Sequence, residues 1–288
     1  LKPDLIITVD NGISSLDGVA AANAAGIDVI VSDHHLPGAE LPAAYAIVNP
    51  NRGDCGFSSK AMAGVGVAYY LLSWVRHTLR QRQWFNSSQR PEPNLGHFLD
   101  LVALGTVADV VPLERNNRIL VHQGLLRMRQ GHTRPGIRAL VEIGKRDLSR
   151  LSAQDLGFAV GPRLNAAGRL QDMSVGIRCL LADDLSSARA LAQELDGLNK
   201  DRRELEQDMI ADAELLLAQV PKIDRTFGVA VYHERFHQGV VGIVAGRLRE
   251  RLHRPAIVFA NSSEGAAGEI KGSARSIDGL NIRDVLDI

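Results

Sequence analysis

The stretch VIVSDHH, residues 29–35, decides how the rest of the chain is interpreted. Its β-branched half, Val29–Val31, is typical of a buried strand, because such side chains pack well on a pleated sheet. Asp33, His34 and His35 follow at once, and burying such polar groups without partners costs several kcal/mol. A metal or phosphate site at the end of this strand is therefore favoured over a polar surface turn.

A second strand is expected just upstream, over residues 5–10, and it ends on Asp10. A helix over residues 14–25 separates the two strands. Strand, helix and strand form a βαβ unit, in which the strands are parallel and the crossover is right-handed. If the strands are neighbours, both end at the sheet edge where open α/β sheets bind ligands. Asp10 is then expected beside the Asp33–His35 triplet.

The next part of the chain reads as a short strand followed by helices. Asp109 lies inside the apolar segment Gly105–Leu113, where a carboxylate is costly unless it is paired or bound to a cation. The alternative is a helix N-cap role for Asp109. The strand is expected over 46–48, and the helices over 61–82, 98–107, 118–129 and 135–144.

A segment rich in Gly, Pro and Ala, residues 161–169, is expected to form a loop. It carries Arg163, Asn165 and Arg169 with little other side-chain bulk. Guanidinium forks match phosphate oxygens, so such a loop can bind a polyanion. A surface loop with incidental arginines explains the same residues equally well.

The last part begins with a helix over residues 186–219, which at 1.5 Å per residue is roughly 50 Å long. Strands are expected over 227–232, 256–259 and 269–271, and a helix from His237 to Leu252. Three features there suit phosphate, because helix N-termini and guanidinium groups bind anions. They are the helix start at His237, the side chain of Arg247, and the segment after the last strand with Ser273 and Arg275.

Bulk composition limits the classes of function. The 288 residues carry 33 Lys+Arg and 33 Asp+Glu, a formal net charge of +0, so a polyanion must be bound locally rather than by overall charge. No stretch reaches the roughly 18 consecutive apolar residues of a membrane span. Cys55 and Cys179 have no metal-binding spacing, which fits a reducing, cytoplasmic compartment.

The candidate cation ligands are carboxylates and imidazoles, a mixed set that indicates Mn²⁺ or a Mn²⁺/Mg²⁺ pair. Metal ions combined with arginine clamps indicate metal-assisted phosphoester hydrolysis, with water as the nucleophile. The ligand candidates are Asp10, Asp33, His34, His35 and Asp109.

Five ordered motifs resemble the DHH phosphoesterase superfamily, and within it the single-strand-specific 5′→3′ DNA exonucleases. The resemblance spans nearly the whole chain and is far more specific than the triplet alone. The motifs are residues 8–12 (TVDNG), 32–35 (SDHH), 105–113 (GTVADVVPL), 161–170 (GPRLNAAGRL) and 237–248 (HQGVVGIVAGRL).

The resemblance implies an α/β fold in which a parallel-sheet DHH domain is joined by a long helix to a smaller α/β DHHA1-type domain. The expected domains are 1–183, the connecting helix 184–221, and 222–288. The resemblance also implies activity in DNA repair and recombination, with single-stranded DNA as the substrate. The implied protein partners are single-strand-binding protein and recombination helicases.

Roles for individual residues follow from the same resemblance. Asp33 and His35 are implied to be catalytic, with Asp33 orienting a histidine by holding its other nitrogen. The implied metal ligands are Asp10, His34, His35 and Asp109. The implied DNA- or phosphate-binding residues are Arg163, Asn165, Arg169, His237, Arg247, Ser273 and Arg275.

The chain also departs from the superfamily's pattern. An Asp-x-Asp motif is expected upstream of Leu1, a Gly-Gly-His segment after Ile288, and an oligonucleotide-binding barrel elsewhere; none is in this sequence. The chain is therefore expected to be a fragment with weak or no activity alone.

Three alternatives remain at the level of sequence. A DHH phosphodiesterase of short oligoribonucleotides or cyclic dinucleotides would share the metal residues. A non-catalytic nucleic-acid-binding scaffold would be free to lose them, yet all four stand in place. A dinucleotide-binding oxidoreductase fits poorly, because residues 10–15 (DNGISS) lack the G-x-G-x-x-G pattern.

Overall fold

The computed structural model describes residues 2–221, 223–262 and 268–286. The chain divides into two compact units, and each is described by itself. The first comprises Leu1–Pro162 and Leu180–Arg189, and the second comprises Arg163–Cys179 and Ala190–Ile288. The domain bounds at residues 183 and 221 stay a prediction.

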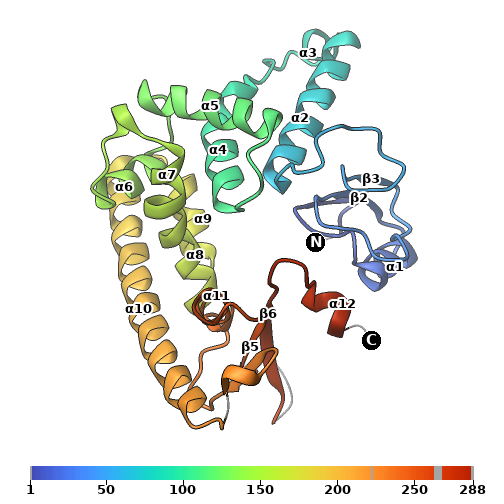
Figure 1. Cartoon of the computed structure of the whole chain (residues 1–288). Helices are drawn as coiled ribbons and strands as arrows, with labels where there is room; N and C mark the ends of the chain where they lie inside the picture. Colours follow the sequence, from blue (N-terminus) through green and yellow to red (C-terminus); the bar gives the residue numbers. More distant parts are fainter. Residues whose placement is uncertain (1, 222, 263–267, 287–288) are drawn as a thin grey trace. The chain divides into compact units, whose positions relative to one another are not determined.

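The first unit begins with the βαβ unit expected from the sequence (Figure 1). Strands β1 (Leu5–Val9) and β2 (Asp28–Ser32) are parallel neighbours, with helix α1 (Leu16–Ala24) between them in sequence. Strand β3 (Ala46–Val48) pairs with β2 on its other side, also in parallel, giving the order β1-β2-β3. All three strands therefore end at the same edge.

Burial explains why β2 forms the centre of this small sheet. Val29 and Val31 are 2% and 0% exposed, and they cluster with Val19 of α1. Because side chains alternate along a strand, this places Val29 and Val31 on the same face. The polar residues start directly after Ser32, where the strand ends, so the core anchors the strand and the sheet edge carries the chemistry.

The remainder of the first unit is helical. Helix α4 (Leu99–Ala108) packs on α5 (Arg115–Arg129), and Asp109 is the C-cap residue of α4. The N-cap role considered for Asp109 is therefore wrong. The other helices are α2 (Gly64–Gln81), α3 (Trp84–Ser87), η1 (Leu95–Phe98), α6 (Pro135–Ile143), η2 (Leu148–Arg150), α7 (Ala153–Asp155) and the π-helix η3 (Leu156–Val160).

The expectation of a loop over residues 161–169 is wrong. Gly161–Leu170 is helix α8, which continues directly from η3, and α9 (Ser174–Leu181) follows. Pro162 lies just after the π-helical turn η3, at the junction with α8. Leu164, Ala166 and Ala167 are 6%, 0% and 0% exposed, so tertiary burial outweighs the turn-forming composition of the segment.

The second unit contains most of the long helix α10 (Leu185–Ala218) and a three-stranded sheet. Strands β4 (Val229–Tyr232) and β5 (Ala256–Asn261) are parallel, and β6 (Ile270–Arg275) is antiparallel to β5. The remaining elements are η4 (Ile223–Arg225), α11 (Val241–Leu252) and α12 (Ile282–Leu286).

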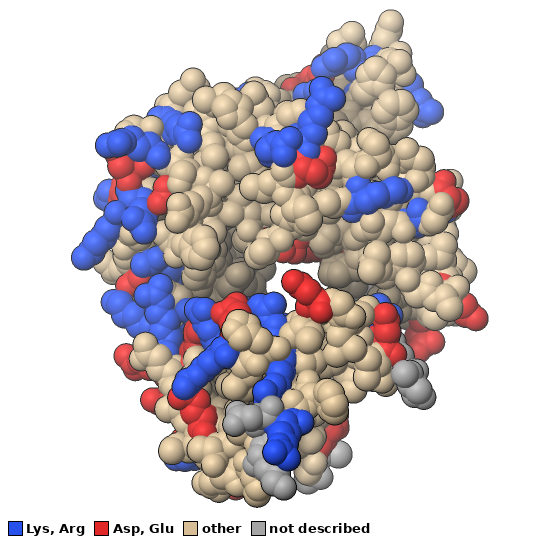
Figure 2. All heavy atoms as spheres, in the orientation of Figure 1, with Lys and Arg blue, Asp and Glu red and all other residues tan. Residues whose placement is uncertain are grey.

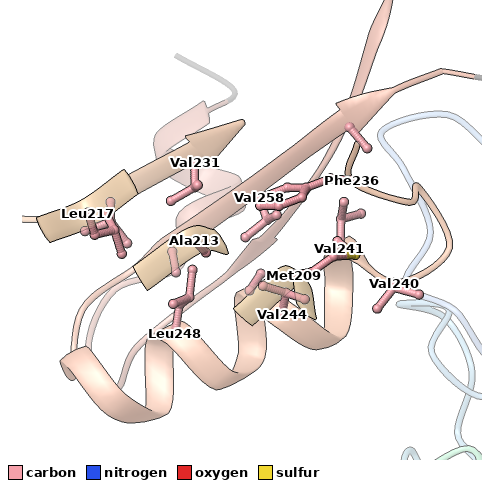
Figure 3. Packing of buried hydrophobic residues seen from close by; sticks show 14 residues of the cluster. Met209, Ala213, Leu217, Val231, Phe236, Val240, Val241, Val244, Leu248 and Val258 are labelled. Atoms are coloured by element: carbon pink, nitrogen blue, oxygen red, sulfur yellow. The ribbon is translucent and has the colours of Figure 1, made fainter. Parts of the chain in front are cut away.

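The core of the second unit lies between α10, α11 and this sheet (Figure 3). Met209 of α10, Val244 of α11 and Val258 of β5 are 3%, 0% and 0% exposed. Ala213 and Leu217 of α10 belong to the same cluster as Met209, so these residues form the apolar face that the helix buries here. Burial of this face, rather than helix propensity, stabilises so long a helix.

Two expected boundaries in the second unit are wrong. Helix α11 begins at Val241 rather than His237, because residues 237–240 form a tight turn in which His237 Nδ1 accepts a hydrogen bond from the Gly239 N–H at 3.1 Å. Ser273 and Arg275 lie within β6 rather than after it, since pairing with β5 extends the strand to Arg275.

The surface carries both signs of charge. Figure 2 shows Lys and Arg side chains interspersed with Asp and Glu over the visible face, in keeping with the formal net charge of +0. Among the described residues, no helix has both the length and the apolar character needed to cross a membrane.

Candidate metal centre and anion site

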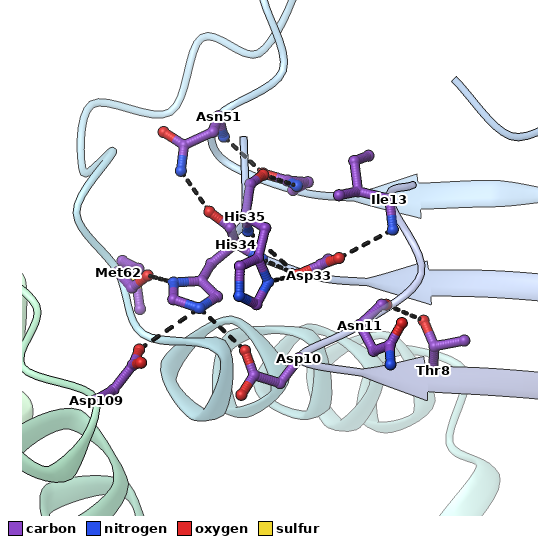
Figure 4. Close-up of polar contacts among 11 residues, drawn as sticks. Thr8, Asp10, Asn11, Ile13, Asp33, His34, His35, Asn51, Met62 and Asp109 are labelled. Atoms are coloured by element: carbon purple, nitrogen blue, oxygen red, sulfur yellow. Dashed lines mark hydrogen bonds and ion pairs between the residues drawn. The ribbon is translucent and has the colours of Figure 1, made fainter. Parts of the chain in front are cut away.

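Asp10, His34 and Asp109 converge at the carboxyl edge of the β1-β2-β3 sheet (Figure 4). The His34 Nε2 atom lies 3.0 Å from Asp10 Oδ1 and 3.5 Å from Asp109 Oδ2. Asp10 and His34 arrive from adjacent strands, and Asp109 arrives from the end of α4. The side chains predicted from topology and from the apolar Asp109 segment are therefore brought together.

The hydrogen bond of the other ring nitrogen of His34 determines which tautomer the imidazole adopts. Nδ1 lies 2.9 Å from the carbonyl oxygen of Met62. A carbonyl only accepts hydrogen bonds, so Nδ1 carries the hydrogen and the Nε2 lone pair faces the two carboxylates. Backbone Met62 O is a functional group that no sequence pattern could have identified.

This arrangement fits a metal ion. Nε2 is buried and has no hydrogen-bond partner among the described residues, although two carboxylate oxygens lie beside it. A lone pair facing carboxylates is unfavourable unless a cation or a proton lies between them. Adjacent ligands of an octahedral ion with bonds of 2.0–2.1 Å are roughly 3 Å apart, a spacing close to that between Nε2 and Asp10.

His35 is the fourth predicted ligand. One ligand atom each from Asp10, His34 and His35 lie within 4.8 Å of one another. The His35 side chain is 61% exposed, so its free nitrogen is open to a ligand or to substrate. Its direct contact with metal stays a prediction.

Asp33 holds the histidines rather than facing the metal position. Its side chain is 1% exposed, and Oδ1 lies 2.7 Å from His35 Nδ1. Oδ1 also accepts the backbone N–H of His34 at 2.7 Å and of His35 at 3.1 Å, while Oδ2 accepts that of Ile13 at 2.9 Å. This geometry matches the orienting role expected for Asp33; its catalytic role stays a prediction.

The surroundings of Asp10 and Asp33 shift the pKa values of these two carboxyl groups in opposite directions. Burial raises the pKa of Asp10 above its ordinary value, His34 offsets part of that rise, and Asp109 adds to it. Burial also acts to raise the pKa of Asp33, but the hydrogen bonds from Ile13 and His35 outweigh it and hold that pKa below the ordinary value. The Asp33 hydrogen bond raises the pKa of His35. Asp10 therefore gains from a nearby cation, whereas Asp33 is already satisfied.

Gly64 makes room for Asp10. Asp10 has a left-handed backbone with φ of 60°, and its side chain lies against the first residue of α2. A Cβ on Gly64 would lie 2.5 Å from Asp10 Cγ and 2.7 Å from Asp10 Cβ, far inside van der Waals contact. From the sequence, Gly64 could be a glycine required only for helix packing. The structure shows that it lies against Asp10, a predicted metal ligand.

Replacing Gly64 with alanine is expected to weaken Mn²⁺ binding by about tenfold or more, because the new methyl group must displace Asp10 by a large part of an ångström. Helix propensity alone would make the same change stabilising by up to about 1 kcal/mol. Mn²⁺ titration followed by electron paramagnetic resonance measures the effect. The control is Gly197→Ala in α10, where no atom of the described residues lies within 4 Å of the added Cβ. Equal metal binding by both variants would refute the role of Gly64.

A second group of predicted residues meets in the second unit, around α8, the start of α11 and β6. Arg169 Nη1 donates to Gly239 O at 3.1 Å, and Arg275 Nη1 donates to Ser273 Oγ at 2.9 Å. A Cβ on Gly242 would lie 2.8 Å from Arg275 Nη2, so α11 begins directly beside Arg275.

This group has an excess of positive charge. Burial lowers the pKa of the Arg169 guanidinium, nearby Arg202 and Arg275 lower it further, and only Glu206 acts against them. Arg202 was not among the predicted binding residues, because it lies within the long helix and outside the five motifs. Within the part of the chain that the structure describes, its Nε is buried without a hydrogen-bond partner. Three guanidinium groups near one carboxylate favour an anion.

The other predicted DNA-binding residues lie differently. Arg163 donates from Nε to Asp196 Oδ1 at 2.8 Å, in a largely buried ion pair. Asn165 is exposed on α8. Arg247 pairs with Glu206 at 3.4 Å and Glu250 at 3.3 Å. The DNA contacts of all three stay predictions.

Comparison with known proteins agrees with this geometry. Residues 2–106 match the DHH family, N-terminal domain, and residues 224–288 match the DHHA1 domain. The chain therefore belongs to the DHH family.

Several relatives are RecJ proteins. The single-stranded-DNA-specific exonuclease RecJ of Salmonella typhimurium is 59% identical over 285 residues, which cover 98% of this chain and 49% of that protein. RecJ of Thermus thermophilus in complex with Mn²⁺ matches with a TM-score of 0.78 at 34% identity, covering 99% of this chain and 40% of that one. The same protein in complex with Mg²⁺ matches with a TM-score of 0.72 at 31% identity, over 99% and 38%. The chain spans about half the length of the RecJ proteins of Salmonella typhimurium and Dickeya dadantii.

Proposed function

We propose that this chain supplies the metal-binding and phosphate-binding parts of a single-strand-specific 5′→3′ DNA exonuclease that releases 5′-mononucleotides. The observation that carries the proposal is the buried Nε2 of His34, which faces Asp10 and Asp109 at 3.0 and 3.5 Å. The proposal draws further support from the relatives named single-stranded-DNA-specific exonucleases.

Asp10, His34, His35 and Asp109 would hold Mn²⁺ or Mg²⁺, as a pair when the metal set is complete. The bound metal would activate water and stabilise the charge that develops on the scissile phosphate. Asp33 fixes the His35 ring through the 2.7 Å contact to Nδ1. His35 therefore presents its exposed nitrogen to the reacting groups in one orientation.

The arginine group would bind the phosphates of the strand. Arg169 and Arg275 offer guanidinium forks, and Ser273 adds a hydroxyl beside them. These groups recognise phosphate rather than base edges, so the binding they supply is independent of sequence. His237 and Arg247 are proposed to contribute to the same face.

The biological setting is part of the same proposal. Activity in DNA repair and recombination, a cytoplasmic location, and single-strand-binding protein and recombination helicases as partners follow from the relationship to RecJ.

The test is a time course with Mn²⁺ on a 5′-phosphorylated single strand, the same sequence as a duplex, and a dinucleotide. We expect mononucleotide release from the single strand, with the duplex cut far more slowly; the Salmonella RecJ serves as positive control. Activity is expected to be weak if ligands outside this chain complete the site. Preference for the dinucleotide would instead indicate an oligonucleotide phosphodiesterase, and strand binding without metal dependence would indicate a scaffold.

A further inference from the structure

Two asparagines that follow β3 contact the backbone of both histidines. Asn49 Nδ2 donates to His35 O at 2.9 Å. Asn51 Nδ2 donates to His34 O at 2.6 Å, a contact that Figure 4 shows. The Asn51 N–H donates to Asn49 Oδ1 at 2.8 Å, which links the two asparagines to each other. The contacts join residues 14 and 17 positions apart.

These contacts complete the backbone hydrogen bonding of the histidine pair. The N–H groups of His34 and His35 both donate to Asp33 Oδ1, at 2.7 and 3.1 Å. Their carbonyl groups both accept from an asparagine amide. Each histidine is therefore held at both ends by a side chain that comes from the carboxyl edge of the sheet.

The asparagines are suited to this arrangement by chemistry and burial. Asn49 is 3% exposed, and its amide donates and accepts at the same time. An aspartate at either position would place a carboxylate against a carbonyl oxygen and lose the donor. Strand pairing ends at Val48, so the two contacts are additional to the β-sheet ladder.

We propose that Asn49 and Asn51 are positioning residues for the metal centre, acting through the peptide groups of His34 and His35. Holding both carbonyls fixes the orientation of the two peptide planes, and with them the directions in which the imidazole rings leave the backbone. Groups that orient metal ligands change metal affinity when they are removed, by about 10–100-fold. The inference rests on the proposed metal-binding function.

The test uses the 288-residue chain and the variants Asn51→Ala, Asn51→Asp and Asn49→Asp. Asn51 is the decisive position, because it is only partly buried and its replacement leaves the core intact. Mn²⁺ affinity is measured by electron paramagnetic resonance, and the metal-free thermal midpoint by circular dichroism. We expect Mn²⁺ affinity to fall by about 10–100-fold in both Asn51 variants, with a metal-free midpoint close to that of the control below.

The matched control is Asn23→Ala. Asn23 Nδ2 also donates to a backbone carbonyl, that of Ala43, at 2.8 Å, but it touches neither histidine. If Asn23→Ala lowers Mn²⁺ affinity as much as Asn51→Ala, the effect is general destabilisation and the inference is overturned.

The experiment also separates this inference from the proposed function. Unchanged affinity in the Asn51 variants, alongside its loss in His34→Ala, would overturn the positioning role while leaving the metal centre in place. Absence of Mn²⁺ binding by the unmodified chain would overturn both. If Asn49→Asp does not fold, the two Asn51 variants decide the question.

Discussion

Replacing His34 and Asp109 together with alanine is expected to lower the Mn²⁺ affinity of this chain by more than about 100-fold, since removal of ligands exceeds the 10–100-fold effect of removing their supports. Of the four predicted ligands, the change leaves Asp10 and His35. It removes His34 Nε2 and Asp109 Oδ2, which now face each other across 3.5 Å. Titration of free Mn²⁺ by electron paramagnetic resonance gives the affinity directly.

The control for this double variant replaces one histidine and one aspartate that lie on the surface. His122 on α5 and Asp17 on α1 are both exposed, and neither takes part in the cluster. The His122→Ala, Asp17→Ala chain should bind Mn²⁺ as the unmodified chain does. Unchanged binding after loss of His34 and Asp109 would show that the metal lies elsewhere, and the proposed centre would have to be abandoned.

Much of the metal centre could be predicted because it follows from topology. Parallel strands joined by one crossover end at the same edge, so Asp10 had to lie near the Asp33–His35 triplet once the two strands were neighbours. Asp109 was identified differently, as a carboxylate in an apolar segment. The contact between Asp109 and His34 depends on how α4 packs on the rest of the unit, and no local pattern encodes that packing.

Two of the groups that sequence reasoning missed act through the backbone or through the absence of a side chain. Met62 contributes a carbonyl oxygen, and Gly64 contributes space for Asp10. Asn49 and Asn51 could have been found, because they follow β3 as Asp10 follows β1 and the triplet follows β2. Polar residues follow all three parallel strands at the same edge of the sheet. The sequence-based prediction considered those after β1 and β2 and passed over those after β3.

The wrong loop prediction has a different cause. Residues 161–169 were expected to form a loop because Gly and Pro favour turns, yet the buried face formed by Leu164, Ala166 and Ala167 makes this segment a helix. Arg163 then turns toward Asp196. Composition describes local preference, and it could not show which side of the segment is buried.

The second large effect is expected for the arginine group, where replacing Arg169 and Arg275 together with alanine should weaken binding of 5′-phosphorylated single-stranded DNA. Each charge-assisted hydrogen bond contributes about 1.5–3 kcal/mol, so the combined loss should exceed about 100-fold at low salt. Because each phosphate contact contributes about 0.7 to the slope of log K against log salt concentration, the slope should become shallower by about 1.4. Fluorescence anisotropy at several salt concentrations measures both quantities.

Two comparisons make this result specific. Arg80→Ala with Arg138→Ala removes two exposed arginines that pair with Glu92 and Glu142, and should leave the slope unchanged. Arg169→Lys keeps the charge but loses the planar fork that also reaches Gly239 O at 3.1 Å, so it should retain the salt slope while losing part of the affinity. If the double variant binds with the slope of the unmodified chain, the excess charge around Arg169 serves the fold and the strand is bound elsewhere.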